Sequence, residues 1–545
     1  MTNETFVNYE SFGAVGDGKT DDFDAIAAAH AYANEHCLPV RGNPDAVYYI
    51  GAKFTRAIPV ETDVDFAGAR FIVDDSVENA FEFRSLPLFL IQRRESLVLE
   101  GEELAAKIGD AKIAREDRAF PWIVPLLSGD SFIRVTNDEH RDFVRFGSNQ
   151  NKGNPRQDVF LVRADGSLDP STVPAFTFDR ITRLEIFPDR EETITVKNGR
   201  FESICCRAGK ETEYKNVYRS FQRGFRVERS DVVIENMTHR MIDEPDMVLD
   251  SGKDDLTPMF GERNESYPYQ GFIVGMLCNR LTIRDCLLTG HTTYYEDKPA
   301  TVSTGGKVPN PVPMGTYDYY FHYCNAVSLI GVKQDVSTGL ADARYWGIMA
   351  SNNCKNFLLD GCEVNRFDAH RGFWNAVLRD CTIGHSINIT GGGHLVLENV
   401  TKLTGSAFLN VRGDYGGSFE GDIVVRNCRH RALTPYNTNR GQTQTDTRMP
   451  IGYLIAHGGS ATELFYNWDF GYELFLPTEI TVENFVSEAA EECYVYTDQG
   501  NIRFENDCRH QHRLTEKITF IGMEPIPTVK KEECTLLKAI PVTVV

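Results

Sequence analysis

The chain has 545 residues, of which 41% are hydrophobic and 11% aromatic, so it can bury a substantial core and is not an intrinsically disordered chain. Its formal net charge of −21 disfavours nonspecific binding to nucleic acid or to an anionic membrane, because both carry dense negative charge. An acidic ligand would therefore need a local cluster of Arg, Lys or His side chains.

The start of the chain carries no recognisable targeting signal. Residues 1–6 lack the basic and apolar regions of a secretory leader, and no run of about 18 apolar residues predicts a membrane span. We therefore expect a cytoplasmic protein, or a secreted one if a leader has been removed. The 13 cysteines include no pair at zinc-finger spacing, which favours reduced thiols and predicts no metal site and no cofactor.

Residues 1–35 are expected to form a cap. A loop rich in glycine, with Asp17 in it, precedes a helix whose apolar stripe contains Ala25, Ile26 and Ala29. Asp21 or Asp22 is predicted to cap the start of this helix. The loop has neither P-loop nor dinucleotide-binding spacing, so phosphate binding is rejected.

Residues 36–190 are interpreted as the first coils of a repeat, interrupted by an insertion. The stretch from about residue 85 onward breaks the repeat with a charged, alanine-rich segment and several prolines. We expect this insertion to form a lateral wall or a subunit contact.

Residues 191–530 contain the pattern that predicts the fold. An apolar-x-apolar segment, a variable residue and then Asn, Asp or Gly recurs ten times, and three copies follow one another at a spacing of 19 residues. The alternation is typical of a strand with one buried face, and Asn, Asp and Gly tolerate the left-handed backbone of a corner. A spacing this short leaves no room for a crossover helix, so a β-solenoid is favoured over hairpins. The ten corner positions are Asn198, Asn236, Asp285, Gly331, Gly361, Asp380, Asn399, Asn427, Asn484 and Gly522.

Cysteine follows the corner in four copies. Stacked coils would place Cys362 directly over Cys381 in the core, and Cys286 and Cys428 occupy the same position. A structural role as small hydrophobic residues is favoured over a metal or redox site.

Two excursions, 291–325 and 432–475, are rich in aromatic residues and are predicted to be loops that pack on the scaffold or bind sugar rings. Their aromatic and histidine side chains are Tyr294, Tyr295, Tyr317, Tyr319, Tyr320, His322, Tyr436, Tyr453, Phe465, Tyr466 and Trp468. Residues 531–545 are expected to be a C-terminal tail.

The stretch Phe12–Ile26 closely resembles the opening of the pectate-lyase-like superfamily, which includes polygalacturonases, rhamnogalacturonases, related lyases and phage tailspikes. This resemblance implies an all-β, single-stranded, right-handed parallel β-helix, with the N-terminal helix covering its first coil. It implies a carbohydrate partner, which we expect to be acidic, and a homo-oligomer such as a trimer; it implies the reaction only weakly.

The candidate site is centred on Arg366–Arg371. Arg366, Asp368 and His370 are spaced by two and so share one side of a strand. Asp368 beside His370 suits a general base, and Arg366 and Arg371 suit a uronate carboxylate. Tyr345, on the preceding coil, is the predicted acid.

Other polar residues a few positions after each corner are expected to align with this cluster in one row. Those assigned to substrate binding are His291, Asp335, Arg344, Asn365, His385 and Asp414. His239, Lys402 and His430 belong to the same expected row.

We therefore predict a carbohydrate-active enzyme, favoured as a uronate-directed lyase or epimerase. Hydrolysis by an Asp pair is the first alternative, with Asp254–Asp255 and Asp335, Asp368 or Asp414 as candidates. The Asn-Thr-Asp of polygalacturonases and the Trp-x-Asp-His of calcium pectate lyases are missing, whereas Asp368-Ala-His370 faintly resembles the Asp-Pro-His of alginate-epimerase-like β-helices. The second alternative is a non-catalytic, glycan-binding protein like a tailspike.

Overall fold

The computed structural model describes most of the chain. The described residues are 6–80, 82–93, 95–142, 153–204, 221–242, 248–249, 271–288, 292–295, 298–301, 306–308, 314–315, 317–334, 347–411, 419–434, 448–457, 474–475, 477–498, 512–513, 515–523 and 542–545. None of the helices within these ranges is long and apolar enough to cross a membrane.

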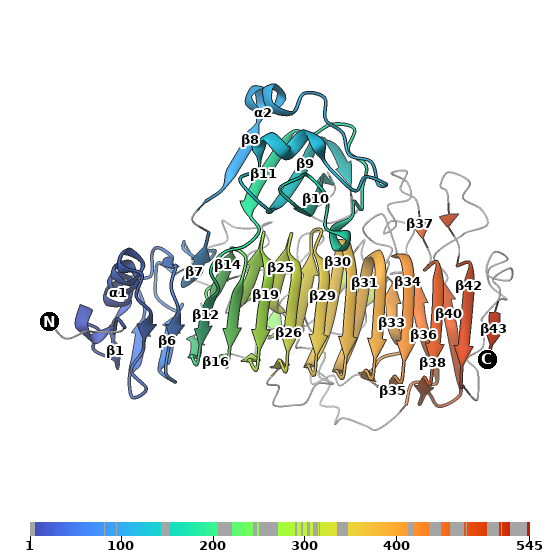
Figure 1. The fold of residues 1–545 in the computed structure, drawn as a ribbon. Helices are drawn as coiled ribbons and strands as arrows, with labels where there is room; N and C mark the ends of the chain where they lie inside the picture. Colours follow the sequence, from blue (N-terminus) through green and yellow to red (C-terminus); the bar gives the residue numbers. More distant parts are fainter. Residues whose placement is uncertain are drawn as a thin grey trace.

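The described strands build a parallel β-helix (Figure 1), as predicted. Each coil contributes one strand to each of three ladders, and the ladders join into one 32-stranded sheet because two strands bend through all three. Neighbouring coils pair in parallel and in register, as between Ile194 and Val232 and between Val232 and Leu281. The hairpin alternative is therefore excluded for this sheet.

The first ladder holds the repeat that the sequence showed. Its strands are β2 (Val40–Arg41), β5 (Val64–Asp65), β12 (Ile194–Lys197), β15 (Val232–Glu235), β19 (Asn279–Arg284), β26 (Asn325–Ile330), β29 (Lys355–Asp360), the ends of β30 (Glu363–Arg379) and β31 (Thr382–Glu398), β34 (Phe419–Arg426), β38 (Glu479–Glu483), β42 (Lys517–Ile521) and β43 (Val542–Val544). The segment 531–545, expected as a tail, thus supplies the last strand of this ladder.

The second ladder follows the corner. Its strands are β1 (Asp17–Asp21), β3 (Val47–Ile50), β6 (Arg70–Asp74), β13 (Arg200–Ile204), β16 (Thr238–Ile242), β20 (Leu287–Leu288), β27 (Lys333–Gln334), the beginnings of β30 and β31, β32 (Thr401–Thr404), β35 (Arg429–Leu433) and β39 (Val486–Ser487).

The third ladder completes each coil. Its strands are β4 (Ile58–Val60), β7 (Phe89–Gln92), β14 (Phe225–Glu228), β18 (Ile273–Met276), β25 (Tyr317–His322), β28 (Gly347–Ser351), the middles of β30 and β31, β33 (Ala407–Val411), β36 (Ile451–His457) and β40 (Glu492–Asp498). Short strands outside the ladders are β17 (Val248–Leu249), β21 (Thr292–Tyr295), β22 (Lys298–Thr301), β23 (Gly306–Val308), β24 (Met314–Gly315), β37 (Leu474–Phe475) and β41 (His512–Arg513).

All ten predicted corner residues have positive φ angles, between 52° and 63°. Their side chains also stack where they are amides or carboxylates. The Nδ2 atom of Asn236 donates to Oδ1 of Asn198 over 2.7 Å, and that of Asn399 donates to Oδ1 of Asp380 over 2.9 Å. The corner residues therefore link successive coils through side chains as well as through the backbone.

Replacing Asn399 with valine is expected to lower the free energy of unfolding by about 1–2 kcal/mol, because a β-branched residue is strained in the left-handed region and loses the bond to Asp380. Asn399→Gly should cost less, since glycine keeps the backbone conformation. Urea titration of both variants tests this expectation. Equal stability of the valine variant and the wild type would contradict it.

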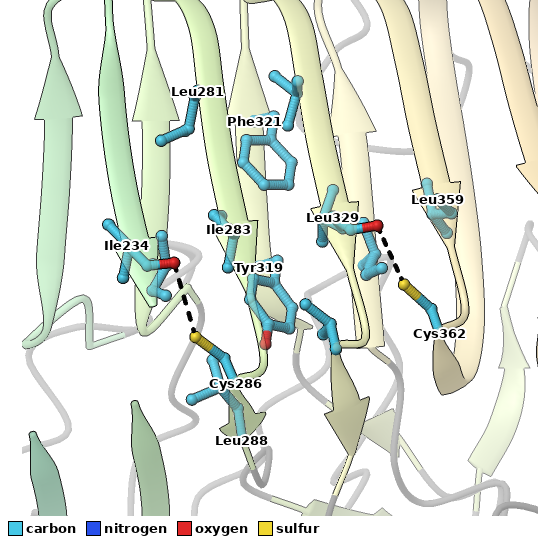
Figure 2. Close-up of a cluster of buried hydrophobic side chains, with 14 of the residues drawn as sticks. Ile234, Leu281, Ile283, Cys286, Leu288, Tyr319, Phe321, Leu329, Leu359 and Cys362 are labelled. Atoms are coloured by element: carbon cyan, nitrogen blue, oxygen red, sulfur yellow. Dashed lines mark hydrogen bonds between the residues drawn. The ribbon is translucent and has the colours of Figure 1, made fainter. Parts of the chain in front are cut away.

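Cysteine fills the core positions after the corner, as predicted. Cys286, Cys362, Cys381 and Cys428 are buried with free thiols. Figure 2 shows Cys286 and Cys362 among the leucine and isoleucine side chains of the core, with Sγ of Cys362 3.3 Å from the carbonyl oxygen of Leu329. A second buried series, Cys278, Cys324 and Cys354, follows the third ladder and was not anticipated.

The N-terminal cap consists of a 3-10 turn (Glu10–Phe12) and helix α1 (Phe23–His36), which lies at the blue end of the solenoid (Figure 1). Ile26 and Ala29 are buried in the core, as predicted. The expected role of Asp22 was wrong: its carboxylate makes no cap and instead accepts the backbone N–H groups of Val15 and Gly16 at 2.7 and 3.2 Å. Asp21 accepts the N–H of Phe23 at 3.2 Å, so the neighbouring carboxylate satisfies the first turn.

We expect the buried histidine of the N-terminal cap to make the free energy of unfolding depend on pH. His30 is fully buried, its Nε2 lies 3.0 Å from the Tyr9 hydroxyl, and burial lowers its pKa from 6.5 to about 3. Between those values the unfolded chain binds a proton that the folded chain does not, so stability falls as the pH drops below about 6.5. From pH 7 to pH 5 His30 should cost about 2 kcal/mol. The difference between urea titrations at the two pH values should shrink by that amount in His30→Gln; an unchanged difference would contradict the assignment.

Residues 95–190 form a separate small domain between β7 and β12, seen above the solenoid in Figure 1. Its antiparallel sheet contains, in spatial order, β10 (Asn154–Val162), β9 (Ser131–Asp142), β11 (Arg183–Pro188) and β8 (Leu97–Glu100). Helix α2 (Gly101–Ile108) and two 3-10 turns (Pro121–Leu126 and Pro170–Thr172) complete it around a core of its own. We call it the insertion domain.

The insertion domain is fastened to the corner between the third and first ladders. Nζ of Lys355 lies 2.8 Å from Oδ1 of Asp158, and both side chains are fully buried. The carbonyl oxygen of Gln157 accepts the side-chain amide of Asn353 at 2.5 Å. The domain is therefore a fixed wall beside the third ladder.

Candidate functional site

The corner between the second and third ladders varies greatly in length. Residues 205–224, 243–272, 289–316 and 335–346 connect the two ladders in the earlier coils, and residues 434–450 do so in a later one. Between these long connections β30 and β31 bend through the corner without interruption, and only Gly405 and Ser406 separate β32 from β33. We call these three the short-corner coils. They mark the stretch of the solenoid where no long connection interrupts the corner.

The predicted cluster lies in the middle part of β30, which belongs to the third ladder. Phe367 and Ala369 point into the hydrophobic core, so Arg366, Asp368 and His370 between and beside them project to the outer face of the third ladder. The spacing of two residues thus correctly predicted that the three side chains lie on the same face of the strand. Their predicted roles in catalysis and substrate binding stay predictions.

Asp368 is the centre of a hydrogen-bond network on that face, although its side chain is fully buried. Its carboxylate accepts hydrogen bonds from the Tyr317 hydroxyl and the Asn388 amide, and Oδ2 lies 2.5 Å from Nε of Arg366. Asn410 on the next coil donates to Oδ1 of Asn388 over 2.9 Å. We call Tyr317, Arg366, Asp368, Asn388 and Asn410 the outer polar network.

The expected pairing of Asp368 with His370 differs from the geometry. Nε2 of His370 is 4.0 Å from Oδ2 of Asp368, which is too far for a hydrogen bond. The shorter contacts with Arg366, Tyr317 and Asn388 occupy the carboxylate instead. His370 keeps a partly exposed side chain, with 13% of its surface open to solvent.

Arg371 belongs to a second group that reaches toward the insertion domain. Its Nε donates to Oδ1 of Asn352 over 2.5 Å, and the amide of Asn352 contacts Nδ1 of His322. Burial lowers the pKa of His322 to about 3, and the positive charge of Arg371 acts in the same direction. His322 is therefore neutral at pH 7 and leaves Arg371 as a charged group next to His370.

The described members of the expected basic row do not share one side of the solenoid. His239, Lys402 and His430 are in register with Leu288 and Ile383 of the core and point inward from the second ladder. Successive residues of a strand face opposite sides, so a shift of one residue at the corner reverses the side. Burial lowers the pKa of Lys402 to about 7 and that of His430 to about 3.

His385 and Asn365 lie at the corners of the short-corner coils. The backbone N–H of Asn365 donates to Oε1 of Gln334 over 2.8 Å, and the residue is buried. Burial is the main cause that lowers the pKa of His385 to about 3; the charges of Arg366 and Lys402 act in the same direction and that of Asp368 opposes them. His385 is thus a neutral group beside Arg366.

The remaining predicted site residues, His291, Asp335, Arg344, Tyr345 and Asp414, lie outside the described residues, as does Asp254–Asp255.

The two aromatic excursions were only partly loops. Tyr317, Tyr319, Tyr320 and His322 belong to strand β25, where Tyr319 is a core residue, and Tyr453 belongs to β36.

Sequence reasoning did not identify Asn388, Asn410 and Asp318 as residues of the site. The two asparagines follow the Asp368 position in register on successive coils, a signal that becomes visible once the coils are aligned. Asp318 follows Tyr317 on β25, where the register with β28 slips by one residue. It is buried, and burial alone raises its pKa well above the usual range, so it is a neutral carboxylic acid.

Among the described residues no group of three His, Cys, Asp or Glu side chains is placed to hold a metal ion. The described side chains of the outer polar network offer charge pairing and proton transfer.

No family model matches the chain, and neither does any curated protein sequence. Solved structures share its architecture at low identity. The tailspike gp61 of Pseudomonas phage phi297 is 11% identical over 99% of this chain and 84% of that one, with a TM-score of 0.48. PfbA, a surface adhesin of Streptococcus pneumoniae, is 10% identical over 95% and 85%, with a TM-score of 0.35. An exopolygalacturonase from Thermotoga maritima is 10% identical over 96% and 88%, with a TM-score of 0.27.

The strand pairing and the N-terminal cap decide the fold without these comparisons. The chain has a parallel β-helix fold. This fold carries several chemistries and also binding proteins, so the function has to be argued from the site.

Proposed function

We propose that the protein binds an acidic glycan on the outer face of the third ladder, at the short-corner coils, and cleaves or epimerises it beside a uronate unit. One observation carries the proposal. In a chain with a net charge of −21, Arg366 and His370 lie beside a single carboxylate, that of Asp368, and Arg371 follows His370 on the same strand. Such a local excess of cationic groups suits an anionic ligand.

The reaction begins with removal of the proton α to the uronate carboxylate. His370 is the proposed base because its side chain is partly exposed beside Asp368. Arg366 and Arg371 stabilise the negative charge that develops on the carboxylate. In elimination the bond from the ring to the leaving oxygen then breaks, and that oxygen takes up a proton; in epimerisation the proton returns to the opposite face.

Tyr317 is the proposed proton donor to the leaving oxygen. Its hydroxyl already donates to Asp368, so it lies within the outer polar network. Tyr345, the donor expected from the sequence, is outside the described residues.

A panel of uronate-containing, sulfated and neutral glycans tests the proposal. Elimination produces a conjugated, unsaturated uronate that absorbs in the ultraviolet, together with a new reducing end. Epimerisation produces neither but changes the uronate composition. Binding without any of these changes would identify a glycan-binding protein and end the catalytic proposal.

Hydrolysis is a second candidate because Asp318 and Asp368 have opposite environments. Asp318 is kept neutral by burial, whereas Asp368 pairs with Arg366, and a neutral acid with an ionised partner is the combination that glycosidases use. Tyr317 connects them, as the chain neighbour of one and the hydrogen-bond donor of the other. New reducing ends without ultraviolet absorbance would select this candidate over elimination.

A further inference from the structure

The insertion domain contains a cleft that the proposed reaction does not use. The cleft has a volume of about 410 Å³, within the range of small-molecule sites. Its walls are formed by β9, β10 and the segments 112–117 and 177–179, which are bridged to each other at Ile113 and Phe178. Its principal lining residues are Lys112, Asp117, His140, Arg156, Phe178 and Asp179.

The polar groups of the cleft are held in place by fixed partners. Arg156 donates to both carboxylate oxygens of Asp142, at 2.7 and 3.0 Å, and to the carbonyl oxygen of Thr177 at 2.8 Å. Nε2 of His140 lies 2.6 Å from the same guanidinium. One oxygen of Asp179 accepts the amide of Asn137 at 3.0 Å. Because these partners are inside the domain, the cleft is formed before any ligand arrives.

The charges of the lining nearly balance. Lys112 and Arg156 are offset by Asp117 and Asp179, Arg156 is also paired with Asp142, and the lining residues Ile113 and Phe178 are almost fully buried. A lining that carries both hydrogen-bond donors and acceptors matches a ligand with many hydroxyl groups better than a strong anion. A pyranose ring has this chemistry.

A bidentate ion pair connects the segment next to the cleft with β34, the strand that pairs with β31. Arg115, next to the lining residue Ala114, donates to the two carboxylate oxygens of Glu420 at 3.2 and 2.9 Å. Glu420 begins β34 and is in register with Gly392 of β31, the strand that also carries Asn388. The cleft segment is thus anchored to the coils that hold the outer polar network.

We propose that this cleft is a distal subsite that binds a sugar unit of the same glycan, some units away from the reacting bond. The inference rests on the proposed function, because the glycan bound at the short-corner coils is the molecule that would extend into the cleft. It predicts that long glycans bind more tightly than short ones, because only they occupy both places at once.

Calorimetric titration with a disaccharide and an octasaccharide of polygalacturonate, alginate and hyaluronan tests the subsite. In the double variant H140A/D179A and separately in Lys112→Ala, the dissociation constant of the octasaccharide should rise about tenfold, while that of the disaccharide stays the same. Arg180→Ala is the matched control, because Arg180 forms an exposed pair with Glu139 in the same domain, outside the cleft. Circular dichroism verifies that the variants fold.

The outcomes separate the two proposals. If the octasaccharide binds the cleft variants as tightly as the wild type and they still convert it, the subsite is wrong and the proposed function stands. If the octasaccharide binds no better than the disaccharide in the wild type, the subsite is also wrong. If no probe binds the wild type, both proposals fail.

Discussion

Replacing Asp368 with asparagine should lower kcat/KM on the glycan that the panel identifies by about 10²–10⁴-fold, the range typical of losing one charged group from a catalytic site. The carboxylate accepts from Tyr317 and Asn388 through different oxygens and pairs with Arg366, so the amide removes the charge partner of Arg366 and leaves a single acceptor oxygen for the two donors. Asparagine has nearly the same shape, which limits the effect on folding. Initial rates of the wild type and the variant give the measurement.

A stability control accompanies this measurement. Asp368 is fully buried beside Arg366, so the amide variant leaves that guanidinium without its charge partner and should also unfold at a lower temperature. Rates are therefore compared well below the unfolding transition of the variant. Glu398→Gln, on the outer face of the first ladder beside Arg426, is the matched acidic control and should keep full activity. Full turnover by the folded Asp368→Asn variant would remove Asp368 from the mechanism.

Lys355→Ala is expected to destabilise the protein by about 3–5 kcal/mol, or to release the insertion domain from the solenoid, because it leaves the carboxylate of Asp158 buried without a cation. The ammonium group of Lys355 also donates to the carbonyl oxygen of Val173 over 2.8 Å, so a second buried acceptor loses its partner. Urea titration measures the loss, and limited proteolysis at the edges of the insertion domain shows whether that domain separates.

The double variant K355M/D158L distinguishes the charge from the packing. Removing both charges together should restore much of the stability, since no unpaired ion remains in the buried contact. The exposed pair of Arg180 and Glu139 provides the contrast, because Arg180→Ala should change the free energy of unfolding by less than about 1 kcal/mol. A small effect of Lys355→Ala, similar to that of Arg180→Ala, would show that the buried pair does not hold the insertion domain against the solenoid.

The amino-acid sequence by itself determined the coil and its corners. The residues that turn the corner are Asn, Asp or Gly because only these enter the left-handed region at low cost, and Asn198, Asp285 and Gly361 all do so. The spacing of 19 residues among the middle copies fixed the parallel register, and alternation fixed the common side of Arg366, Asp368 and His370. These features are local, so a single coil contains the information for them.

The tertiary structure decided what the local pattern leaves open. Lys402 and His430 point inward whereas Asp368 points outward, because the number of residues in the second corner sets which side each later residue faces. The contacts of Asp368 come from Tyr317 and Asn388 on other coils, and those of Asp158 come from Lys355, far along the chain. Stacking and docking bring such groups together, and no spacing within one coil records which partners will meet.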